Sequence, residues 1–261
     1  MIRGLLAGLR GLLPGRAVVH QPPALPSGLA VYAIGDIHGE LSALRNLLSE
    51  IVADAGRHPP ATRRIIVCLG DYVDRGPDSR GVIELLAAGP PPGFELRCLR
   101  GNHDQAMLDF LHEPEAADDW FRFGAAATLD SYGIGTAGGT GPGRLTGLRD
   151  ALAAGLPPGH RAFLENLEPS MVLGDYAFVH AGIRPGRPLA QQDLHDLMWI
   201  REPFLSWPGR HEKVIVHGHS VVPVPQVLPN RVALDTGAYA TGVLTAAALD
   251  GDRLRILQAG R

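Results

Sequence analysis

The sequence predicts an α/β protein with mixed β-sheets flanked by helices and a helical insertion. Three observations support this fold class. Short, β-branched apolar runs bounded by Gly and Pro recur from residue 29 onward, which is the pattern of buried strands. Helical patterns separate the first three runs, as in βαβ units with parallel strands. Residues 105–169 break this rhythm and are expected to form the helical insertion.

The expected strands follow one another along the chain as Leu29–Ile34, Ile65–Leu69, Phe94–Leu99, Tyr176–Val179, Val214–Val216, Arg231–Leu234 and Gly242–Leu249. Helices are predicted over residues 40–56 and 78–89, between the first three strands. The first helix has its apolar residues on one face, at Leu41, Leu44, Leu47, Leu48 and Ile51. The later strands are separated by short turns such as Asp250-Gly251-Asp252, so part of the sheet system is expected to be antiparallel.

Residues 1–28 contain three Arg and no acidic residue, followed by a Pro-rich stretch, and we expect them to form a flexible basic leader. Residues 29–261 are expected to form a single domain, in which residues 105–169 are the insertion or lid. No stretch reaches the roughly 18 to 20 consecutive apolar residues of a membrane span, because Arg3 and Arg10 interrupt the opening segment. Stable membrane insertion is therefore not expected.

The charge balance argues against nucleic acid as a partner. There are 24 Lys and Arg residues against 27 Asp and Glu residues, so no basic excess exists to neutralise phosphates. The two cysteines, Cys68 and Cys98, each lie inside an apolar run, as reduced and buried thiols do. A cytoplasmic location is expected, and the oligomeric state stays open.

Polar residues directly follow five of the predicted strands. In chain order they are Asp36 and His38, then Asp71, Asp74 and Arg75, then Arg100, Asn102 and His103, then His180, then His217 and His219. In an α/β sheet the carboxyl ends of the strands form the ligand crevice, so these groups are expected to converge. One strand-end Asp-Gly pair is usually only a turn, but five polar strand ends indicate a site.

The donor types point to metal ions. Carboxylate, amide and imidazole donors without a thiolate suit Mn, Fe or Zn, and there are more of them than one ion needs. A two-metal site is implied, in which one carboxylate bridges both ions and a water between them becomes a hydroxide at neutral pH.

The segments GDIHG, GDYVDRG, LRGNHD, VHAG and VHGHS occur in this order between Gly35 and Ser220. They resemble the phosphoprotein phosphatase family of the calcineurin-like metallophosphoesterase superfamily, and particularly its small bacterial and phage protein phosphatases. The segment Leu197–Arg201 and the sequence ALDTGA around Asp235 also resemble parts of that family. The resemblance implies a metallophosphoesterase-type layered sandwich as the catalytic domain.

The resemblance also implies roles for individual residues. It makes Asp36 and His38 ligands of one metal, Asp71 the bridging ligand, and Asn102, His180 and His219 ligands of the other. His103 is implied as the general acid, oriented by Asp74, and Arg75, Arg100 and Arg201 as phosphate ligands. The two ions are expected to be Mn, with Fe and Zn as alternatives. The implied reaction is in-line attack of the metal-bridging hydroxide on a phosphomonoester, without a phosphoenzyme.

The expected substrate is a phosphoprotein carrying phosphoserine or phosphothreonine, with phosphotyrosine and small phosphomonoesters as further candidates. A symmetrical dinucleoside polyphosphate hydrolase is the main alternative; those enzymes resemble this chain but typically lack the equivalents of Asp74 and Arg100. A catalytically silent metal-binding module is the alternative from another class. A phosphodiesterase is disfavoured because Val221 stands where that class usually has a second histidine.

Two departures from the resembled pattern affect residues beside the site. Asp104 stands where the protein phosphatases more often have Glu, and GHSVV replaces their usual GHTP. His217 is expected to be a hydrogen-bonded structural histidine. The aromatic residues of the insertion, among them Phe110, Trp120 and Phe123, are expected to pack in the core or lid.

Overall fold

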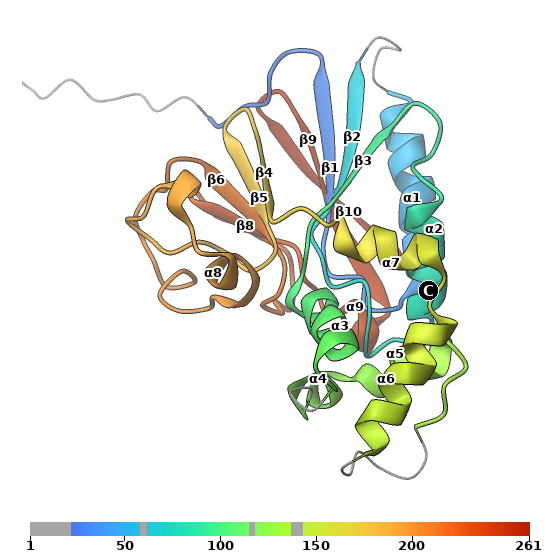
Figure 1. Cartoon of the computed structure of the whole chain (residues 1–261). Coiled ribbons are helices and arrows are strands. Elements are labelled where there is room, and N and C mark those ends of the chain that lie inside the picture. The colour runs from blue at the N-terminus through green and yellow to red at the C-terminus, as the bar shows by residue number, and fades with distance from the viewer. Residues whose placement is uncertain (1–21, 58–61, 115–117, 137–142) are drawn as a thin grey trace, which may run out of the picture.

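Two five-stranded sheets face each other in the computed structural model, which describes residues 22–57, 62–114, 118–136 and 143–261. The first sheet has the strand order β10-β9-β1-β2-β3, and the second has the order β4-β5-β6-β8-β7 (Figure 1). The strands of the first sheet are β1 (Leu29–Ile34), β2 (Arg63–Cys68), β3 (Glu95–Cys98), β9 (Val243–Asp250) and β10 (Arg253–Gly260). Those of the second are β4 (Ser170–Leu173), β5 (Tyr176–Val179), β6 (Val214–His217), β7 (Gln226–Val227) and β8 (Arg231–Ala233).

Both sheets are mixed. Strands β1, β2 and β3 are parallel, whereas β9 pairs antiparallel with both β1 and β10. In the second sheet β5, β6 and β8 are parallel, and the edge strands β4 and β7 are antiparallel to their neighbours. The predicted fold class, with βαβ units followed by antiparallel strands, is therefore confirmed.

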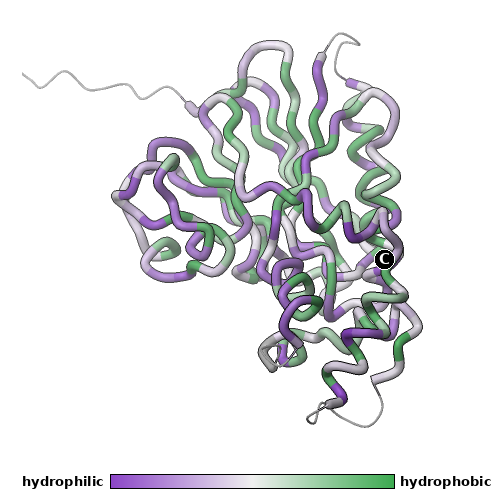
Figure 2. The backbone as a smooth tube through the Cα atoms, viewed as in Figure 1, coloured by the Kyte–Doolittle hydropathy of each residue, from purple (hydrophilic) through white to green (hydrophobic). Residues whose placement is uncertain are grey.

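Strand β1 shows why the central strands are apolar along their whole length. Successive side chains of a strand point to opposite faces. Val31 and Ala33 face the second sheet and pack in the core between the sheets, while Tyr32 and Ile34 face the helices. All four are at most 1% exposed. A strand buried on both faces needs a continuous apolar run, and Figure 2 shows the strands as largely hydrophobic.

Helices cover the outer face of the first sheet and extend beyond it. The first two are α1 (Leu41–Ala55) and α2 (Ser79–Ala87), close to the predicted ranges. The described parts of residues 102–165 contain five further helices, and Figure 1 shows α3 to α6 at the bottom of the view; they are α3 (Asn102–His112), α4 (Asp118–Phe123), α5 (Ala125–Ser131), α6 (Arg144–Gly155) and α7 (Pro158–Glu165). The remaining helical segments are a 3₁₀ turn (Leu189–Gln191), α8 (Leu194–Trp199) and α9 (Ala238–Thr241).

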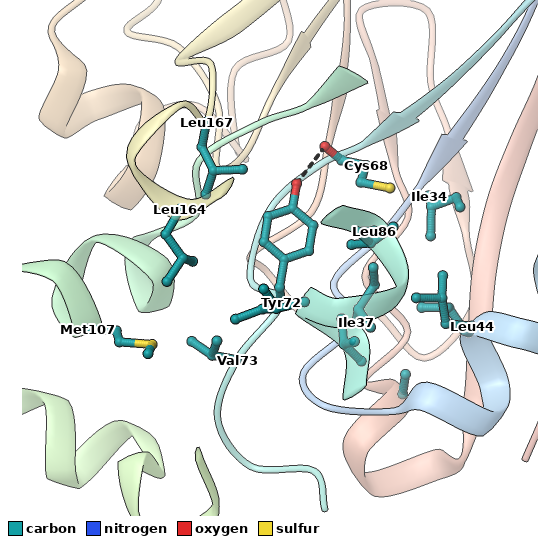
Figure 3. Packing of buried hydrophobic residues seen from close by; sticks show 14 of the residues in the cluster. Ile34, Ile37, Leu44, Cys68, Tyr72, Val73, Leu86, Met107, Leu164 and Leu167 are labelled. Atoms are coloured by element: carbon teal, nitrogen blue, oxygen red, sulfur yellow. Dashed lines mark hydrogen bonds between the residues drawn. The ribbon is translucent and has the colours of Figure 1, made fainter. Parts of the chain in front are cut away.

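Tyr72 ties together the ends of β2 and β3, from which two site loops leave. Its hydroxyl donates to the carbonyl of Leu99 at 2.8 Å and lies 3.3 Å from that of Cys68, the contact drawn as a dashed line in Figure 3. The ring is fully buried among apolar side chains that include Val73 and Met107. This packing holds the two loops in register with each other.

Three of the described strands lie outside the predicted runs, namely β4, the two-residue β7 and β10, and all three are edge strands. Strand β4 pairs with β5 through a turn at Gly174-Asp175, and β10 pairs with β9 through a turn at Gly251-Asp252. Strand β4 mixes buried and exposed residues, and the residues of β10 are half-buried or exposed. Neither strand has the continuous apolar run that marked the central strands. Edge position, which a sequence does not reveal, explains their composition.

Part of the expected leader contacts the domain. Residues 1–21 lie outside the described residues, whereas Leu25 is buried and donates its N–H to the carbonyl of Gly251 at 2.9 Å. The N–H of Ala24 donates to Asp175 at 3.1 Å. Within the described ranges, no helix is both long and apolar enough to cross a membrane.

Candidate active site

The predicted site residues lie at the carboxyl ends of β1, β2 and β3 in one sheet and of β5 and β6 in the other. The six residues predicted as metal ligands are nearly inaccessible, with exposed fractions of 0–8%; they are Asp36, His38, Asp71, Asn102, His180 and His219. Because parallel strands end at one edge, loops that are far apart in sequence meet there. The structure thus brings together these side chains from both sheets.

Two groups of donor atoms share Asp71. The first contains Asp71, His38 and His103, the second contains Asp71, His180 and His219, and the donor atoms of each group lie within 4.8 Å of one another. The Asp71 carboxylate oxygen Oδ2 is 3.5 Å from Nε2 of His38 and also 3.5 Å from Nε2 of His180. A carboxylate between two such groups has the geometry of a bridging ligand.

Asn102 completes the second group. Its amide oxygen Oδ1 is 2.9 Å from Nε2 of His180 and 2.9 Å from Nδ1 of His219. Four oxygen and nitrogen donors from β2, β3, β5 and β6 therefore converge on one point. This donor set, without sulfur, suits Mn, Fe or Zn.

Two of the histidines are oriented by backbone carbonyls. Nδ1 of His38 is 2.8 Å from the carbonyl of Val73, and Nδ1 of His180 is 3.0 Å from that of Leu69. Since a carbonyl only accepts, each Nδ1 carries the hydrogen and each Nε2 keeps its lone pair for a ligand. Burial lowers the pKa of both rings well below the usual value, so both are neutral, as a metal-binding imidazole must be.

Three buried carboxylates lie near one another at the same place. Burial, together with the charges of Asp235 and Asp71, raises the pKa of Asp36 well above its usual value. Burial also raises the pKa of Asp71 to about 6. The oxygen Oδ2 of Asp235 is buried without a hydrogen-bond partner. Like charges crowded in this way are stable when cations neutralise them, so the residues present fit two divalent ions.

Glycines make room for two of these carboxylates. A Cβ atom at Gly101 would lie 2.1 Å from Oδ1 of Asp71, and one at Gly218 would lie 1.9 Å from Oδ1 of Asp36. Any larger residue would displace the carboxylates, because such distances are far below van der Waals contact. The lack of space for a Cβ atom therefore explains why glycine stands at positions 101 and 218.

Backbone strain is concentrated at the site. In the described ranges, five residues other than glycine have positive φ, namely His38, Asp71, Asp74, Arg75 and His219, with φ between 44° and 73°. Each such conformation costs on the order of 1–3 kcal/mol and persists only where the surrounding structure imposes it. All five are residues that the sequence analysis assigned to the site.

His103 differs from the other histidines. Its Nδ1 lies 2.7 Å from Oδ2 of Asp74, and its backbone N–H donates to Asp71 at 3.0 Å. Burial opposes protonation, but the carboxylates of Asp71 and Asp74 outweigh it and raise the pKa of His103. Neighbouring groups whose pKa values move in opposite directions are typical of acid–base sites.

The three predicted phosphate ligands are placed differently. The Arg75 guanidinium lies 3.0 Å from Nε2 of His38 and 3.1 Å from Nε2 of His103. The guanidinium carbon Cζ of Arg75 is also 4.7 Å from the centre of the Tyr239 ring. Arg201 is exposed and lies at the rim of the site. Burial of His219 is the main cause that lowers its pKa to about 3, and the charge of Arg201 adds to this effect. The Arg100 guanidinium instead donates to Gln105 at 3.0 Å and to the carbonyl of Glu165, at the end of α7, at 2.8 Å.

Asp104 and Asp235 were not assigned to the site from the sequence. The Asp104 carboxylate accepts from the backbone N–H groups of Asp71, Tyr72 and Gly101, each at 2.9 Å, and so joins the loops after β2 and β3. Burial and the charge of Asp71 raise its pKa to about 8. Asp235 follows the predicted strand Arg231–Leu234, so the strand-end rule that found the other site residues also applies to it.

His217 has the structural environment that was expected. It is fully buried, its Nδ1 lies 3.0 Å from the carbonyl of Gly218, and its ring packs 5.0 Å from that of Phe204. Burial lowers its pKa to about 3, so it is neutral.

Comparison with known proteins gives a family and two kinds of relative. Residues 29–243 match the calcineurin-like phosphoesterase family. Serine/threonine-protein phosphatase 1 of Salmonella typhimurium is 29% identical over 83% of this chain and 90% of its own length. A symmetrical bis(5'-nucleosyl)-tetraphosphatase of a Janthinobacterium species is 28% identical over 84% of this chain and 92% of its own length.

A solved structure supports the fold. The crystal structure of a cold-active protein-tyrosine phosphatase from a psychrophilic Shewanella species superimposes with a TM-score of 0.58 at 16% identity, covering 91% of this chain and 83% of that one. Because the family match covers more than half of the chain and includes every one of the predicted ligands, the chain belongs to the calcineurin-like phosphoesterase family.

Proposed function

We propose that this phosphoester hydrolase is a phosphomonoesterase that acts as a protein phosphatase on phosphoserine and phosphothreonine, with phosphotyrosine as a further substrate. The observation that carries this proposal is the pair formed by His103 and Asp74, at 2.7 Å, in which His103 also lies in the first donor group, with Asp71 and His38. An alkoxide leaving from phosphoserine is a very strong base and needs a proton donor. A nucleotide leaving from a polyphosphate is a weak base and does not.

The metal ions supply the nucleophile and part of the charge neutralisation. Two divalent ions would be held by Asp36, His38, Asp71, Asn102, His180 and His219, and when bound they would lower the pKa of a coordinated water and polarise the phosphoryl group. We propose Mn²⁺ in both sites, with Fe and Zn as alternatives. Elemental analysis of protein purified without added metal tests this, with about two ions per chain as the expected content.

The side chains of the protein have the remaining roles. Arg75 and Arg201 bind the phosphate oxygens, because a guanidinium fork matches phosphate geometry. His103 gives its Nε2 proton to the leaving oxygen, while Asp74 holds Nδ1 and stabilises the imidazolium. The ligands are at most 8% exposed, so bulk water is largely excluded from the reacting atoms.

A substrate panel tests the proposed activity. The metal-loaded protein is assayed on phosphoserine, phosphothreonine and phosphotyrosine peptides, para-nitrophenyl phosphate and diadenosine tetraphosphate, and kcat/KM is compared. We expect the peptides to exceed the dinucleotide by at least about tenfold. A preference for diadenosine tetraphosphate would assign the chain to the symmetrical dinucleoside polyphosphate hydrolases, and no turnover of any substrate would indicate a silent metal-binding module.

We also propose a cytoplasmic location. It is supported by Cys68 and Cys98, which are free thiols although they are paired residues of the neighbouring strands β2 and β3. A reducing compartment keeps such thiols free. Fractionation of cells that express the chain, with a periplasmic marker as control, tests this location.

A further inference from the structure

The carboxylate of Asp74 accepts two further hydrogen bonds in addition to its contact with His103. Its oxygen Oδ2 also accepts the indole N–H of Trp120 at 2.9 Å, and its oxygen Oδ1 accepts the hydroxyl of Thr128 at 2.6 Å. The same hydroxyl accepts the backbone N–H of Asp74 at 2.8 Å. Asp74 is 0%, Thr128 0% and Trp120 1% exposed, so water does not replace these contacts.

Both donors come from the helical insertion. Trp120 lies on α4 and Thr128 on α5, 46 and 54 residues after Asp74 in the chain. Helix α4 packs against α3, which begins with Asn102 and His103, and α5 contacts α4 and α2 (Figure 1). Two helices of the insertion therefore contact Asp74, which lies in the loop after β2.

The chemistry of the two donors is suited to holding a carboxylate. An indole N–H can only donate, and it cannot take a proton from His103 or from Asp74. The threonine hydroxyl donates to the side chain and accepts from the backbone of the same residue, which holds Asp74 at its positive φ of 73°. Together the two donors leave one orientation for the carboxylate, with Oδ2 directed at His103.

We propose that Trp120 and Thr128 are positioning residues for catalysis, which hold the Asp74 carboxylate so that His103 points at the leaving oxygen. This inference rests on the proposed function, in which His103 is the proton donor. It makes residues 118–131 part of the acid–base machinery, in addition to any part that they have in covering the site.

A packing role alone is the alternative for Trp120. Its ring contacts those of Phe110 and Phe121, with centroids 4.8 and 5.8 Å apart. Phenylalanine at position 120 keeps an apolar ring in this cluster and removes only the N–H donor. Valine at position 128 keeps the shape of threonine without its hydroxyl, and serine keeps the hydroxyl without the methyl group.

The experiment compares Trp120→Phe, Thr128→Val and Thr128→Ser with His103→Asn and with Phe121→Leu as a packing control on the same helix. For each metal-loaded variant, kcat and KM are measured on phosphoserine peptide, phosphotyrosine peptide and para-nitrophenyl phosphate, with melting temperature and metal content as checks of folding. We expect Trp120→Phe and Thr128→Val to lower kcat on phosphoserine by about tenfold at unchanged KM, as expected for a lost bond to a charged group.

The pattern across substrates identifies the mechanism. The loss should be largest for phosphoserine, smaller for phosphotyrosine and smallest for para-nitrophenyl phosphate, because the basicity of the leaving oxygen falls in that order. Thr128→Ser and Phe121→Leu should stay within about threefold of the parent. In an Asp74→Asn background, Trp120→Phe should have little further effect on kcat, since coupled residues are not additive.

Equal losses on all three substrates in Trp120→Phe and Thr128→Val, with a graded loss in His103→Asn, would overturn the positioning role and leave the proposed function intact. Equal losses in His103→Asn as well would refute the proton-donor assignment itself, and the positioning role with it. A Thr128→Ser variant as slow as Thr128→Val would also count against the proposal, because the hydroxyl would then be irrelevant.

Discussion

Asp71 is the residue on which most of the candidate site depends. Its carboxylate lies in both donor groups, accepts the backbone N–H of His103 at 3.0 Å, and occupies the space that a side chain at Gly101 would fill. Its own backbone N–H is held by Asp104 at 2.9 Å. A change at this one position should therefore affect both metal sites.

Asp71→Asn is expected to lower the affinity for both ions and to abolish turnover, because a neutral amide replaces the shared negative charge. Asn102→Ala, the matched variant in the second group only, should mainly lower the affinity for one ion. Equilibrium dialysis followed by elemental analysis measures both contents. Normal binding of two ions by an active Asp71→Asn protein would contradict the bridging assignment.

Among the elements, α7 is held at its carboxyl end by Arg100. A cation at the last carbonyls of a helix is favourable, and the guanidinium is 2.8 Å from the carbonyl of Glu165. We expect Arg100→Ala to lower the free energy of unfolding by about 1–2 kcal/mol, as for a lost hydrogen bond with a charged partner. Denaturant unfolding of parent and variant measures this.

The same variant tests the predicted phosphate contact of Arg100. If the guanidinium also reaches the substrate, kcat/KM on phosphopeptides should fall by roughly ten- to a hundredfold without loss of metal. Unchanged kinetics in a destabilised protein would limit Arg100 to holding α7. Arg201→Ala removes a proposed phosphate ligand that does not touch the helix end, so it should lower kcat/KM and leave the free energy of unfolding unchanged.

Asp54 links α1 to both β1 and β10. It accepts the Tyr32 hydroxyl at 2.9 Å and two bonds from Arg255, at 2.5 and 2.8 Å. Burial alone would raise the pKa of Asp54, but the bonds from Arg255 and Tyr32 outweigh it and hold the pKa below its usual value. The stability that Asp54 contributes is thus present above about pH 3.9, the unfolded value, and is lost as the pH falls through the lower folded value.

Asp54→Asn should therefore lower the free energy of unfolding by about 1 kcal/mol at pH 7. The value is modest because Arg255 is 39% exposed and water screens the pair. The difference from the parent should shrink as the pH falls below about 3.9. Urea unfolding between pH 2.5 and 7 measures it. A difference that grows toward low pH would contradict the sign of the pKa shift.

At the scale of the whole molecule, the candidate metal site joins the two sheets. Asp36, Asp71 and Asn102 follow strands of the first sheet, whereas His180 and His219 follow strands of the second. An ion that binds only the folded protein stabilises it by about 2.7 kcal/mol when its free concentration is a hundredfold above Kd. For a chain of this size, 1 kcal/mol corresponds to roughly 2–4 °C in Tm.

Addition of Mn²⁺ to the chelated protein should accordingly raise Tm by about 5–10 °C for each site filled. Differential scanning calorimetry with and without chelator measures the shift. The Asp71→Asn protein is the control and should show a much smaller rise. An equal rise in that variant would place the stabilising ions elsewhere.

The sequence by itself determined the fold class, the family and the place of the site. Continuous apolar runs predicted the central strands because those strands are buried on both faces, and Asp36, Asp71, Asn102, His180 and His219 were found because each follows such a run. The rule that parallel strands end at one edge accounts for their convergence within each sheet, whereas the meeting of the two edges depends on how the two sheets pack together. The roles of the individual residues stay predictions.

Only the tertiary structure decided which side chains from the rest of the chain reach the site. Trp120 and Thr128 lie in a stretch whose helical spacing predicts packing, and their bonds to Asp74 depend on how α4 packs against α3 and how α5 packs against α2. Arg100 turns to α7 because that helix ends beside β3. A hydrogen bond between residues 46 positions apart is set by the relative placement of whole elements, which local sequence patterns do not encode.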